Sequence, residues 1–325
     1  MNPVKKTVMV KMLNLFNFAL YRLTLEALES IELTRFNKGI TLRGAFGSVF
    51  RRLVCHDLGE DCKHCALHSS CPYGFVFTPM VPGDAERLRL NRDIPRPFVI
   101  KPPVDGKNIY RPGDIILFKL VVVGKAQDFL PYFIVTFEEL GRQGIGIRRG
   151  RFSMRKIEVL RPDGAWDEVF RSDDRMVRPP EKPLSFDLFA GMRDYDQNKV
   201  RIRFLTPVLI KEKGRWVRPD FAPLVKRLRD RVNSLSYFYC NETLEMDFHL
   251  FGEMAETVRT IYHDLRWVEE KRVSKHKGLN HLLKGYMGEV EFEGQLGGFM
   301  PFLRVGQFIH VGKATAFGQG WYKMD

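Results

Sequence analysis

The sequence predicts an α+β fold made of two consecutive domains. The chain has 325 residues, which is long for one compact domain, so two domains are expected. Strand-like and helix-like hydrophobic periods follow one another in a similar order in each half: strand, helix, strands, helix, strand. Between the halves lies a polar, proline-containing stretch, Pro162–Pro183, which indicates a linker.

The first half begins, after an expected N-terminal extension over residues 1–14, with a strand and a helix. Side chains after Phe18 alternate as in a half-buried strand, with Leu23, Leu25 and Ala27 on one face and Arg22, Thr24 and Glu26 on the other. Thr41 is suited to cap a following helix that extends to Cys55. Apolar residues recur in it at helical spacing, namely Leu42, Phe46, Val49, Phe50 and Leu53.

The remaining elements are predicted by the same periods. The segment from Asp57 to Gly106 is proline-rich and expected to be irregular. Strands are expected at Asp114–Val123, Phe152–Leu160, Val200–Ile210, Met287–Phe292 and Gly320–Lys323. Helices are expected at Ala126–Leu140, Phe221–Phe238, Met254–Val268 and Phe299–His310.

This order predicts tandem ferredoxin-like (RRM-like, βαββαβ) domains, with a cysteine-rich insertion at about 55–110 in the first. We expect the N-terminal domain at 15–165, the linker at 166–195 and the C-terminal domain at 196–325.

The chain is strongly basic. The chain contains 52 Lys and Arg residues and 39 Asp and Glu residues, which gives a formal net charge of +13. Such an excess favours a polyanionic partner, nucleic acid before membrane, although a basic surface without a special partner stays open. No apolar run approaches the roughly 18–20 residues of a transmembrane helix, and Lys11 interrupts the apolar N-terminal stretch. We therefore expect a cytoplasmic protein that does not bind membranes.

Four of the five cysteines are clustered. Cys55, Cys62, Cys65 and Cys71 have the short spacing with which four thiolates close a tetrahedral zinc site, and His64 or His68 could replace one of them. An iron–sulfur cluster and metal-free thiols are the alternatives. A closed site of this kind would be structural, so we expect no catalytic metal. The isolated Cys240 is expected in the core.

Two basic runs could contact nucleic acid, or could be solvated faces. One surrounds the turn Gly144–Phe152 and contains Arg142, Arg148, Arg149, Arg151, Arg155 and Lys156. The other contains Lys271, Arg272, Lys275, His276 and Lys277. Arginine is suited both to phosphate and to stacking on bases.

The C-terminal stretch is rich in glycine. Gly312, Lys313, Thr315, Gly318 and Gly320 follow an apolar helical segment. Glycine admits positive φ, and consecutive N–H groups in such a loop can form a concave anion site. The loop could therefore hold a phosphodiester backbone; the alternative is a tight turn into a terminal strand.

The motif His310-Val-Gly-Lys-x-Thr-x-Phe-Gly-x-Gly320 resembles the C-terminal loop of the CRISPR precursor-RNA-processing endoribonucleases of the RAMP superfamily. Leu42-Arg-Gly-Ala-Phe-Gly47 resembles the first-helix motif of that family, and Gly144-Ile-Gly-Ile-Arg-Arg-Gly-Arg-Phe152 resembles its internal Gly/Arg motif. Cys62-x-x-Cys65-x5-Cys71-Pro-Tyr resembles a cysteine cluster found in one branch.

The resemblance implies one cut per CRISPR repeat without a catalytic metal, leaving a 2′,3′-cyclic phosphate and a 5′-hydroxyl. The implied partners are CRISPR repeat RNA and other CRISPR-associated effector subunits; a homodimer is also open. For RNA contact we select Arg35, Arg148, Arg149, Arg151, Lys275, Lys277, Gly312, Lys313, Thr315, Gly318 and Gly320.

Attack by the 2′-hydroxyl needs a base, an acid and cations around the phosphorane. The family often places a histidine just before or within the first helix, but the window from Thr34 to Gly47 has none. Lys38 and Arg43 would instead stabilise charge there. The candidate proton carriers are His276, whose lysine neighbours disfavour its charged form, His56, which could also support the zinc site, and His310, which could also be structural.

Two rival functions remain open at this level. The lack of a histidine in the first helix favours a non-catalytic repeat-RNA-binding RAMP subunit of an effector complex. The other rival is a generic zinc-containing nucleic-acid-binding protein outside CRISPR biology.

Overall fold

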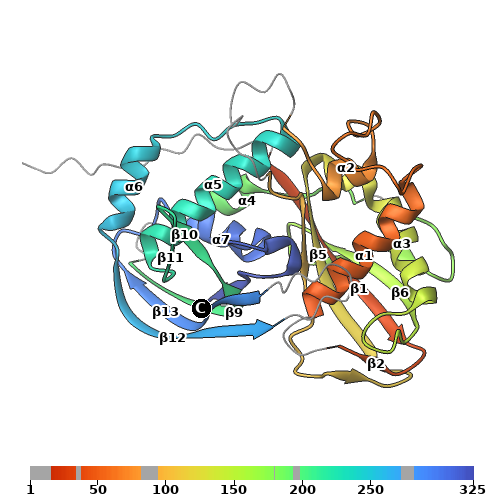
Figure 1. The fold of residues 1–325 in the computed structure, drawn as a ribbon. Helices are drawn as coiled ribbons and strands as arrows, with labels where there is room; N and C mark the ends of the chain where they lie inside the picture. Colours follow the sequence, from red (N-terminus) through yellow and green to blue (C-terminus); the bar gives the residue numbers. More distant parts are fainter. Residues whose placement is uncertain (1–15, 34–37, 82–93, 179, 193–197, 272–281) are drawn as a thin grey trace, which may run out of the picture.

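The computed structural model describes residues 16–33, 38–81, 94–178, 180–192 and 198–271, and residues 282–325. The expected extension over residues 1–14 lies outside these ranges. The protein is α+β, with an N-terminal and a C-terminal half side by side (Figure 1).

The N-terminal half has an antiparallel sheet in the order β3-β5-β1-β6-β7. Its strands are β1 (Asn17–Ala27), β3 (Phe98–Lys101), β5 (Ile115–Val123), β6 (Phe152–Leu160) and β7 (Trp166–Arg171). Its longer helices are α1 (Lys38–Val54) and α3 (Leu130–Gln143), which pack with one face of the sheet in a common apolar core. The smaller elements are β2 (Ile31–Glu32), α2 (Pro72–Phe77), β4 (Ile109–Tyr110), η1 (Gly124–Phe129), β8 (Leu184–Ser185) and α4 (Phe186–Ala190).

The C-terminal half has an antiparallel sheet in the order β12-β13-β9-β14. Its strands are β9 (Lys199–Val208), β12 (Arg259–Lys271), β13 (Leu282–Glu293) and β14 (Tyr322–Met324). A separate hairpin consists of β10 (Ile210–Glu212) and β11 (Arg215–Val217). The helices are α5 (Phe221–Cys240), α6 (Phe248–Glu256), α7 (Met300–Ile309) and the 3₁₀ turn η2 (Thr315–Phe317).

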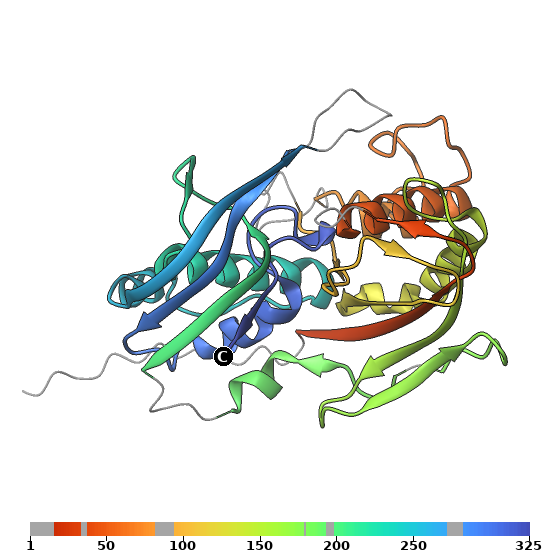
Figure 2. The same cartoon turned by 90° about the horizontal axis from the view of Figure 1, so that it is seen from below.

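Strand β1 joins the two halves because its two faces enter different cores. Tyr21 and Leu23 pack with α1 and α3, whereas Phe18 and Leu20 belong to the core of the C-terminal half. The ring of Phe18 lies 5.2 Å from that of Phe308 in α7. Figure 2 shows the end of β1 reaching the C-terminal half. Apolar side chains on both faces therefore pack the halves against each other.

The structure differs from the predicted elements at four places. The first helix begins at Lys38, so Thr41 lies inside it and not at its cap. The helix expected at Met254–Val268 is wrong: α6 ends at Glu256, and the next residues form β12, whose backbone pairs with β13 over nearly its whole length. This long-range pairing outweighs the local helical period.

The other two differences are strands in segments expected to be irregular. Strand β3 lies within the proline-rich segment, and its four residues are buried because it lies between the two cores. The expected linker at 166–195 contains β7, which pairs with β6, and β8, which pairs with β1. No helix in the described part of the chain is both long and apolar enough to span a membrane.

Candidate functional site

The N-terminus of α1 lies directly against the glycine-rich C-terminal loop. A Cβ atom on Gly39 would overlap the carbonyl oxygen of Phe317. The guanidinium of Arg43 lies 4.5 Å from the ring centre of Phe317 and 5.2 Å from that of Phe77. The fold thus brings two predicted motifs from opposite ends of the chain into one contact.

Lys38 begins α1 and is almost completely buried. Its Nζ donates a hydrogen bond to Asp105 Oδ1 at 2.6 Å and another to the Tyr110 hydroxyl at 3.0 Å. The Tyr110 hydroxyl in turn donates to Asp105 Oδ2 at 2.7 Å. The three side chains form a closed group, as the burial of a charged lysine requires.

The pKa values in this group follow from its hydrogen bonds. Burial raises the pKa of Asp105, but the hydrogen bonds from Lys38 and Tyr110 outweigh it, so that the pKa lies below its usual value. Burial, and then the hydrogen bond to Asp105, raise the pKa of Tyr110. Tyr110 therefore stays protonated at neutral pH and serves as a donor, not a base.

Lys38 lines a cavity of about 200 Å³ between the two halves. The N-terminal half supplies the segment after β3, and the C-terminal half supplies the end of β9 and β13. Besides Lys38, the lining residues are Pro102, Pro103, Val104, Gly106, Leu205, Thr206, Pro207 and Met287.

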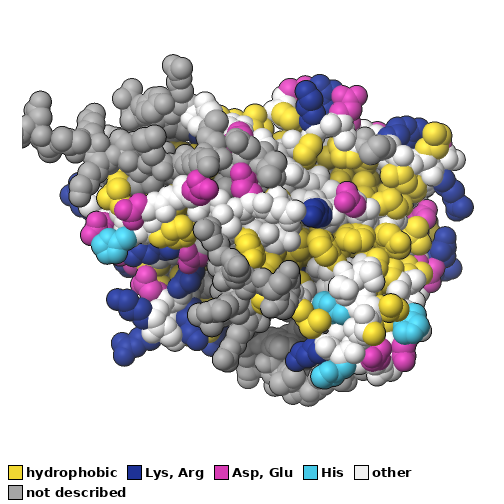
Figure 3. Space-filling model, turned by 90° about the horizontal axis from the view of Figure 1, so that it is seen from above, with side chains coloured by type: hydrophobic (Ala, Val, Ile, Leu, Met, Phe, Trp, Pro, Cys, Tyr) yellow, Lys and Arg dark blue, Asp and Glu magenta, His cyan; other side chains and the backbone are white. Residues whose placement is uncertain are grey.

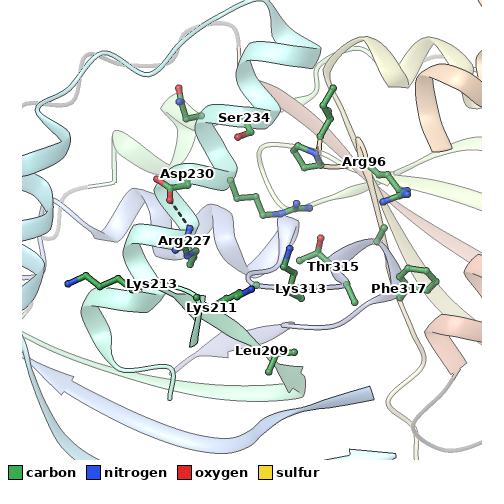
Figure 4. A pocket seen from close by; sticks show the side chains of 18 of the residues that line it. Arg96, Leu209, Lys211, Lys213, Arg227, Asp230, Ser234, Lys313, Thr315 and Phe317 are labelled. Carbon is green, nitrogen blue, oxygen red and sulfur yellow. Dashed lines mark hydrogen bonds and ion pairs between the residues drawn. The ribbon is translucent and has the colours of Figure 1, made fainter. Parts of the chain in front are cut away.

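A larger pocket of about 750 Å³ is lined by the C-terminal loop, α5, the β10–β11 hairpin and the segment before β3. Six cationic side chains line it: Arg96, Lys211, Lys213, Arg227, Arg231 and Lys313. Figure 4 shows Lys313 and Thr315 between the hairpin lysines and Arg96 of the other half. The lining carboxylate, Asp230, pairs with Arg227 and Arg229, so the described lining is electropositive.

Arg231 is a partly buried cation of this pocket. Burial lowers the pKa of Arg231 to about 10, so it remains charged at neutral pH. Its Nε donates to the carbonyl of Ile309 at 2.9 Å. In Figure 3, Lys and Arg side chains also gather on the C-terminal half, at the lower left of the view.

The C-terminal loop uses many of its amides to hold its own shape. The N–H groups of Lys313, Gly318 and Gly320 donate to the carbonyls of Leu209, Thr315 and Pro207, at 2.9 to 3.0 Å. Gly312, Gly318 and Gly320 have positive φ, and a Cβ on any of them would collide with a backbone carbonyl. The glycines therefore serve a tight turn, while Gly312, Lys313 and Thr315 line the pocket.

His310 lies in the core beneath this loop. It is fully buried, its ring stacks at 5.8 Å on Trp321, and it lines neither cavity. Burial, and then the neighbouring cations Lys101 and Arg231, lower the pKa of His310 well below its usual value. A neutral core residue is the role that fits this environment, in place of a proton carrier that meets substrate.

Lys101 is a buried residue that the sequence analysis missed. Its Nζ donates to the carbonyl of Gln307 at 2.7 Å and lies 4.6 Å from the ring centre of Trp321. Burial, and then the charges of Lys119 and Lys323, lower the pKa of Lys101 well below its usual value.

The other predicted site residues lie elsewhere. His56 is exposed just beyond the C-terminal end of α1, and this helix alone spans about 24 Å from Lys38 to Val54. It does not join the Lys38 group. Arg35, Lys275, His276 and Lys277 lie outside the described residues.

The Gly/Arg turn lies beside β2, whose partner strand β4 carries Tyr110. Arg148 is 3.9 Å from Glu32, and Arg151 pairs with Glu29 at 2.7 Å. Arg149 is exposed and has a positive φ. Nearby carboxylates thus offset two of the three arginines of this turn that were predicted to contact RNA.

Cys55, Cys62, Cys65 and Cys71 are free and half-buried in the segment from the end of α1 to α2. In the described chain, which includes all four, no group of three or more His, Cys, Asp or Glu side chains is placed to hold a metal ion. The structure as it stands does not assemble the predicted zinc ligands.

The sequence analysis also missed most of the large pocket and both hydrogen-bond partners of Lys38. Asp105, Tyr110, Arg96, Arg227 and Arg231 come from scattered segments, with no motif around them. A signal did exist for Lys211 and Lys213, because a Lys-Gly turn between short β-prone segments is typical of a hairpin.

Comparison with known proteins gives two family matches. Residues 16–182 match a model described as AF_1859_N, N-terminal domain. Residues 202–322 match the model of the CRISPR-associated endoribonuclease Cas6. An uncharacterized protein of Archaeoglobus fulgidus is 25% identical over 298 residues, which cover 88% of this chain and 91% of that protein.

Solved structures show the same fold. The Thermus thermophilus Cas6 TTHB231 has a TM-score of 0.53 at 15% identity and matches 95% of this chain and 99% of its own. Its product complex has a TM-score of 0.57 at 14% identity, with the same coverage. A partial Cas6-RT-Cas1–Cas2 complex has a TM-score of 0.59 at 16% identity and matches 97% of this chain and 47% of its own. The C-terminal part of the chain therefore matches the Cas6 family of CRISPR-associated endoribonucleases, and the chain as a whole shares the fold of solved Cas6 structures.

Proposed function

We propose that this protein cuts CRISPR repeat RNA without a catalytic metal, at the junction between its two halves. The observation that carries the proposal is the contact between α1 and the C-terminal loop, with the Lys38 cavity and the six-cation pocket nearby. The pocket is suited to the RNA backbone, because clustered cations bind phosphates. The Lys38 cavity would take the reacting phosphate.

In the proposed reaction, the 2′-hydroxyl oxygen attacks the adjacent phosphorus and the bond to the 5′-oxygen breaks. A base removes the proton of the 2′-hydroxyl, and an acid supplies a proton to the leaving 5′-oxygen. The products are a 2′,3′-cyclic phosphate and a 5′-hydroxyl. Lys38 and Arg43 would stabilise the negative charge that develops at phosphorus. His276 stays our predicted proton carrier.

We further propose that the two halves are tandem ferredoxin-like domains. The order of the long elements supports this: each half has β-strand, helix, two strands, helix and strand. The two sheets have the equivalent orders β3-β5-β1-β6 and β12-β13-β9-β14. The cysteine-rich segment then lies between the first helix and second strand of the first domain, and we propose that it marks the cysteine-cluster branch of the family.

Cleavage of labelled repeat RNA in EDTA tests the proposed chemistry. We expect one cut per repeat in EDTA, with cyclic-phosphate ends, and no cut when the scissile nucleotide is 2′-deoxy. The deoxy RNA should still bind. Cleavage that requires magnesium, or that proceeds on the deoxy RNA, would contradict the mechanism.

A non-catalytic RNA-binding role is the second candidate. It is favoured by one observation: no histidine of the described chain lines either cavity. Tight repeat binding without cleavage in any buffer would select it. For either role, other CRISPR-associated subunits are proposed partners, because one structurally similar Cas6 belongs to a Cas6-RT-Cas1–Cas2 complex.

A structural zinc ion held by Cys55, Cys62, Cys65 and Cys71 also stays a prediction. We expect about one zinc per chain by elemental analysis, and its loss in the double variant Cys65→Ser/Cys71→Ser. The matched control Cys240→Ser, a buried cysteine outside the cluster, should keep the metal. Protein that purifies without zinc and gains no thermal stability when zinc is added would refute the prediction.

A further inference from the structure

Trp216 is an exposed aromatic residue on the β10–β11 hairpin, outside both cavities. Its side chain is 44% exposed. Lys211 lies directly opposite in the hairpin, and its Nζ is 5.6 Å from the indole ring centre. Lys284, from β13, approaches the same ring at 5.9 Å. Two cations from different strands thus lie over an indole ring that is still 44% exposed.

The two lysines are available to a ligand anion. In the part of the chain that the structure describes, no ion pair joins Lys211 or Lys284 to a carboxylate. Tyr262 offers the contrast on the same half: it is 49% exposed beside Arg201, but Arg201 pairs with Glu291 at 2.8 Å. Only the Trp216 cluster therefore combines an open ring with cations that lack a described carboxylate partner.

Lys211 connects this cluster to the basic pocket, because it also lines the pocket wall. A strand whose phosphates lie in the pocket would reach Trp216 at its edge. A second exposed aromatic, Trp267, contacts Tyr286 at 5.1 Å on the face of β12–β13 that also carries Lys284. The exposed aromatic side chains thus continue from Trp216, at the edge of the pocket, onto the paired strands β12 and β13.

We propose that Trp216 stacks an unpaired base of the bound RNA where the strand leaves the basic pocket, while Lys211 and Lys284 hold its flanking phosphates. This rests on the proposed function, because it assumes RNA in the pocket. An indole face can stack on any base, but only on one whose own face is uncovered, which selects single-stranded RNA over a duplex. The ligand class is an unpaired polyribonucleotide, without a strong demand on sequence.

Equilibrium binding with two synthetic probes tests the proposal. One probe is a labelled uridine octamer; the other is an abasic octamer with the same phosphates and no bases. Trp216→Ala should weaken binding of the uridine octamer between about five- and one-hundredfold and leave the abasic probe unchanged. Trp216→Phe should restore part of the affinity, and Lys211→Ala should weaken both probes.

Tyr262→Ala is the matched control and should bind both probes as the wild type does. Equal loss for both probes, or no loss with Trp216→Ala in protein of unchanged thermal midpoint, would overturn the proposal. Cleavage of repeat RNA is measured separately, with the wild-type protein. A protein that never cuts but loses octamer binding on Trp216→Ala would refute the nuclease proposal and keep the stacking site.

Discussion

At the residue scale, Lys38 is the most constrained charge of the site. A buried cation is costly unless its donors are satisfied, and Asp105 and Tyr110 satisfy two of the three ammonium donors. A third donor then remains for a ligand in the adjoining cavity. A lysine held charged in this way supplies positive charge, so in the proposed reaction the proton transfer must come from another group.

Replacement of Lys38 should separate chemistry from binding. We expect Lys38→Ala to lower the single-turnover cleavage rate by about 10²–10³-fold, the usual effect of losing one charge-stabilising donor, with only a small change in the Kd for repeat RNA. Tyr110→Phe should have a smaller effect, because Lys38 keeps its pairing with Asp105. Arg148→Ala serves as the control. An unchanged cleavage rate in folded Lys38→Ala would exclude Lys38 from the chemistry.

His310 should make the stability of the protein depend on pH. The pKa of His310 is lowered in the folded protein. Below about pH 6.5, His310 is therefore protonated in the unfolded chain but stays neutral in the native state. The free energy of unfolding should therefore fall as the pH drops below about 6.5, by up to about 1.4 kcal/mol per pH unit, until the native pKa is reached.

Urea unfolding at pH 7.5, 6.5 and 5.5 measures this dependence. His310→Gln should flatten the slope, whatever its effect on stability at pH 7.5. His249→Gln, which changes an exposed histidine, should leave the slope as in the wild type. A wild-type slope that persists in His310→Gln would show that another group is responsible.

At the element scale, the start of α1 determines how the C-terminal loop docks. Gly39 and Gly44 lie in the same helix but in opposite surroundings. A methyl group on Gly39 would overlap the Phe317 carbonyl, whereas nothing lies within 4 Å of the corresponding position on Gly44. The glycine at position 39 thus permits the close approach of two chain segments.

The two alanine variants should change stability in opposite directions. Gly39→Ala should lower the free energy of unfolding by about 1–3 kcal/mol, as expected for overpacking, and should slow cleavage by displacing the loop. Gly44→Ala should raise it by up to about 1 kcal/mol through helix propensity. Denaturant midpoints and cleavage rates of both variants give the comparison. Equal stability of Gly39→Ala and the wild type would mean that the loop moves aside without cost.

At the scale of the whole molecule, the excess of positive charge has a definite location. The net charge of +13 does not by itself show where on the molecule the positive charge lies. Many surface arginines are paired with carboxylates, as Arg148 and Arg151 are. The large pocket, in contrast, collects six cations from both halves. Affinity for RNA should therefore depend on the pocket far more than on the Gly/Arg turn.

The salt dependence of repeat binding tests this difference. If the pocket lysines contact phosphates as proposed, Lys213→Ala/Lys313→Ala should reduce the slope of log Kd against log salt by about two. The control Arg148→Ala/Arg151→Ala removes the same formal charge from the paired turn and should leave the slope nearly unchanged. The reverse ranking would place the RNA on the Gly/Arg turn, as the sequence motif suggested.

The sequence by itself determined much of this protein. Local periodicity predicted the long elements around Phe18, Phe221 and Phe299, because one apolar face on each is enough to specify strand or helix. The C-terminal glycine motif indicated the family, which the comparisons support. The charge balance indicated a polyanionic partner.

Only the tertiary structure decided which side chains share the candidate site. Strand β12 forms because β13 pairs with it, and no local period encodes that. Lys38 could be selected from the window Thr34–Gly47, but Asp105 and Tyr110 follow it by more than sixty residues and meet it because β4 pairs with β2. His310 looked like a site residue and is in the core, since burial depends on the packing of both halves around it. Spacing along a chain specifies elements; contact between distant elements specifies which side chains share a cavity.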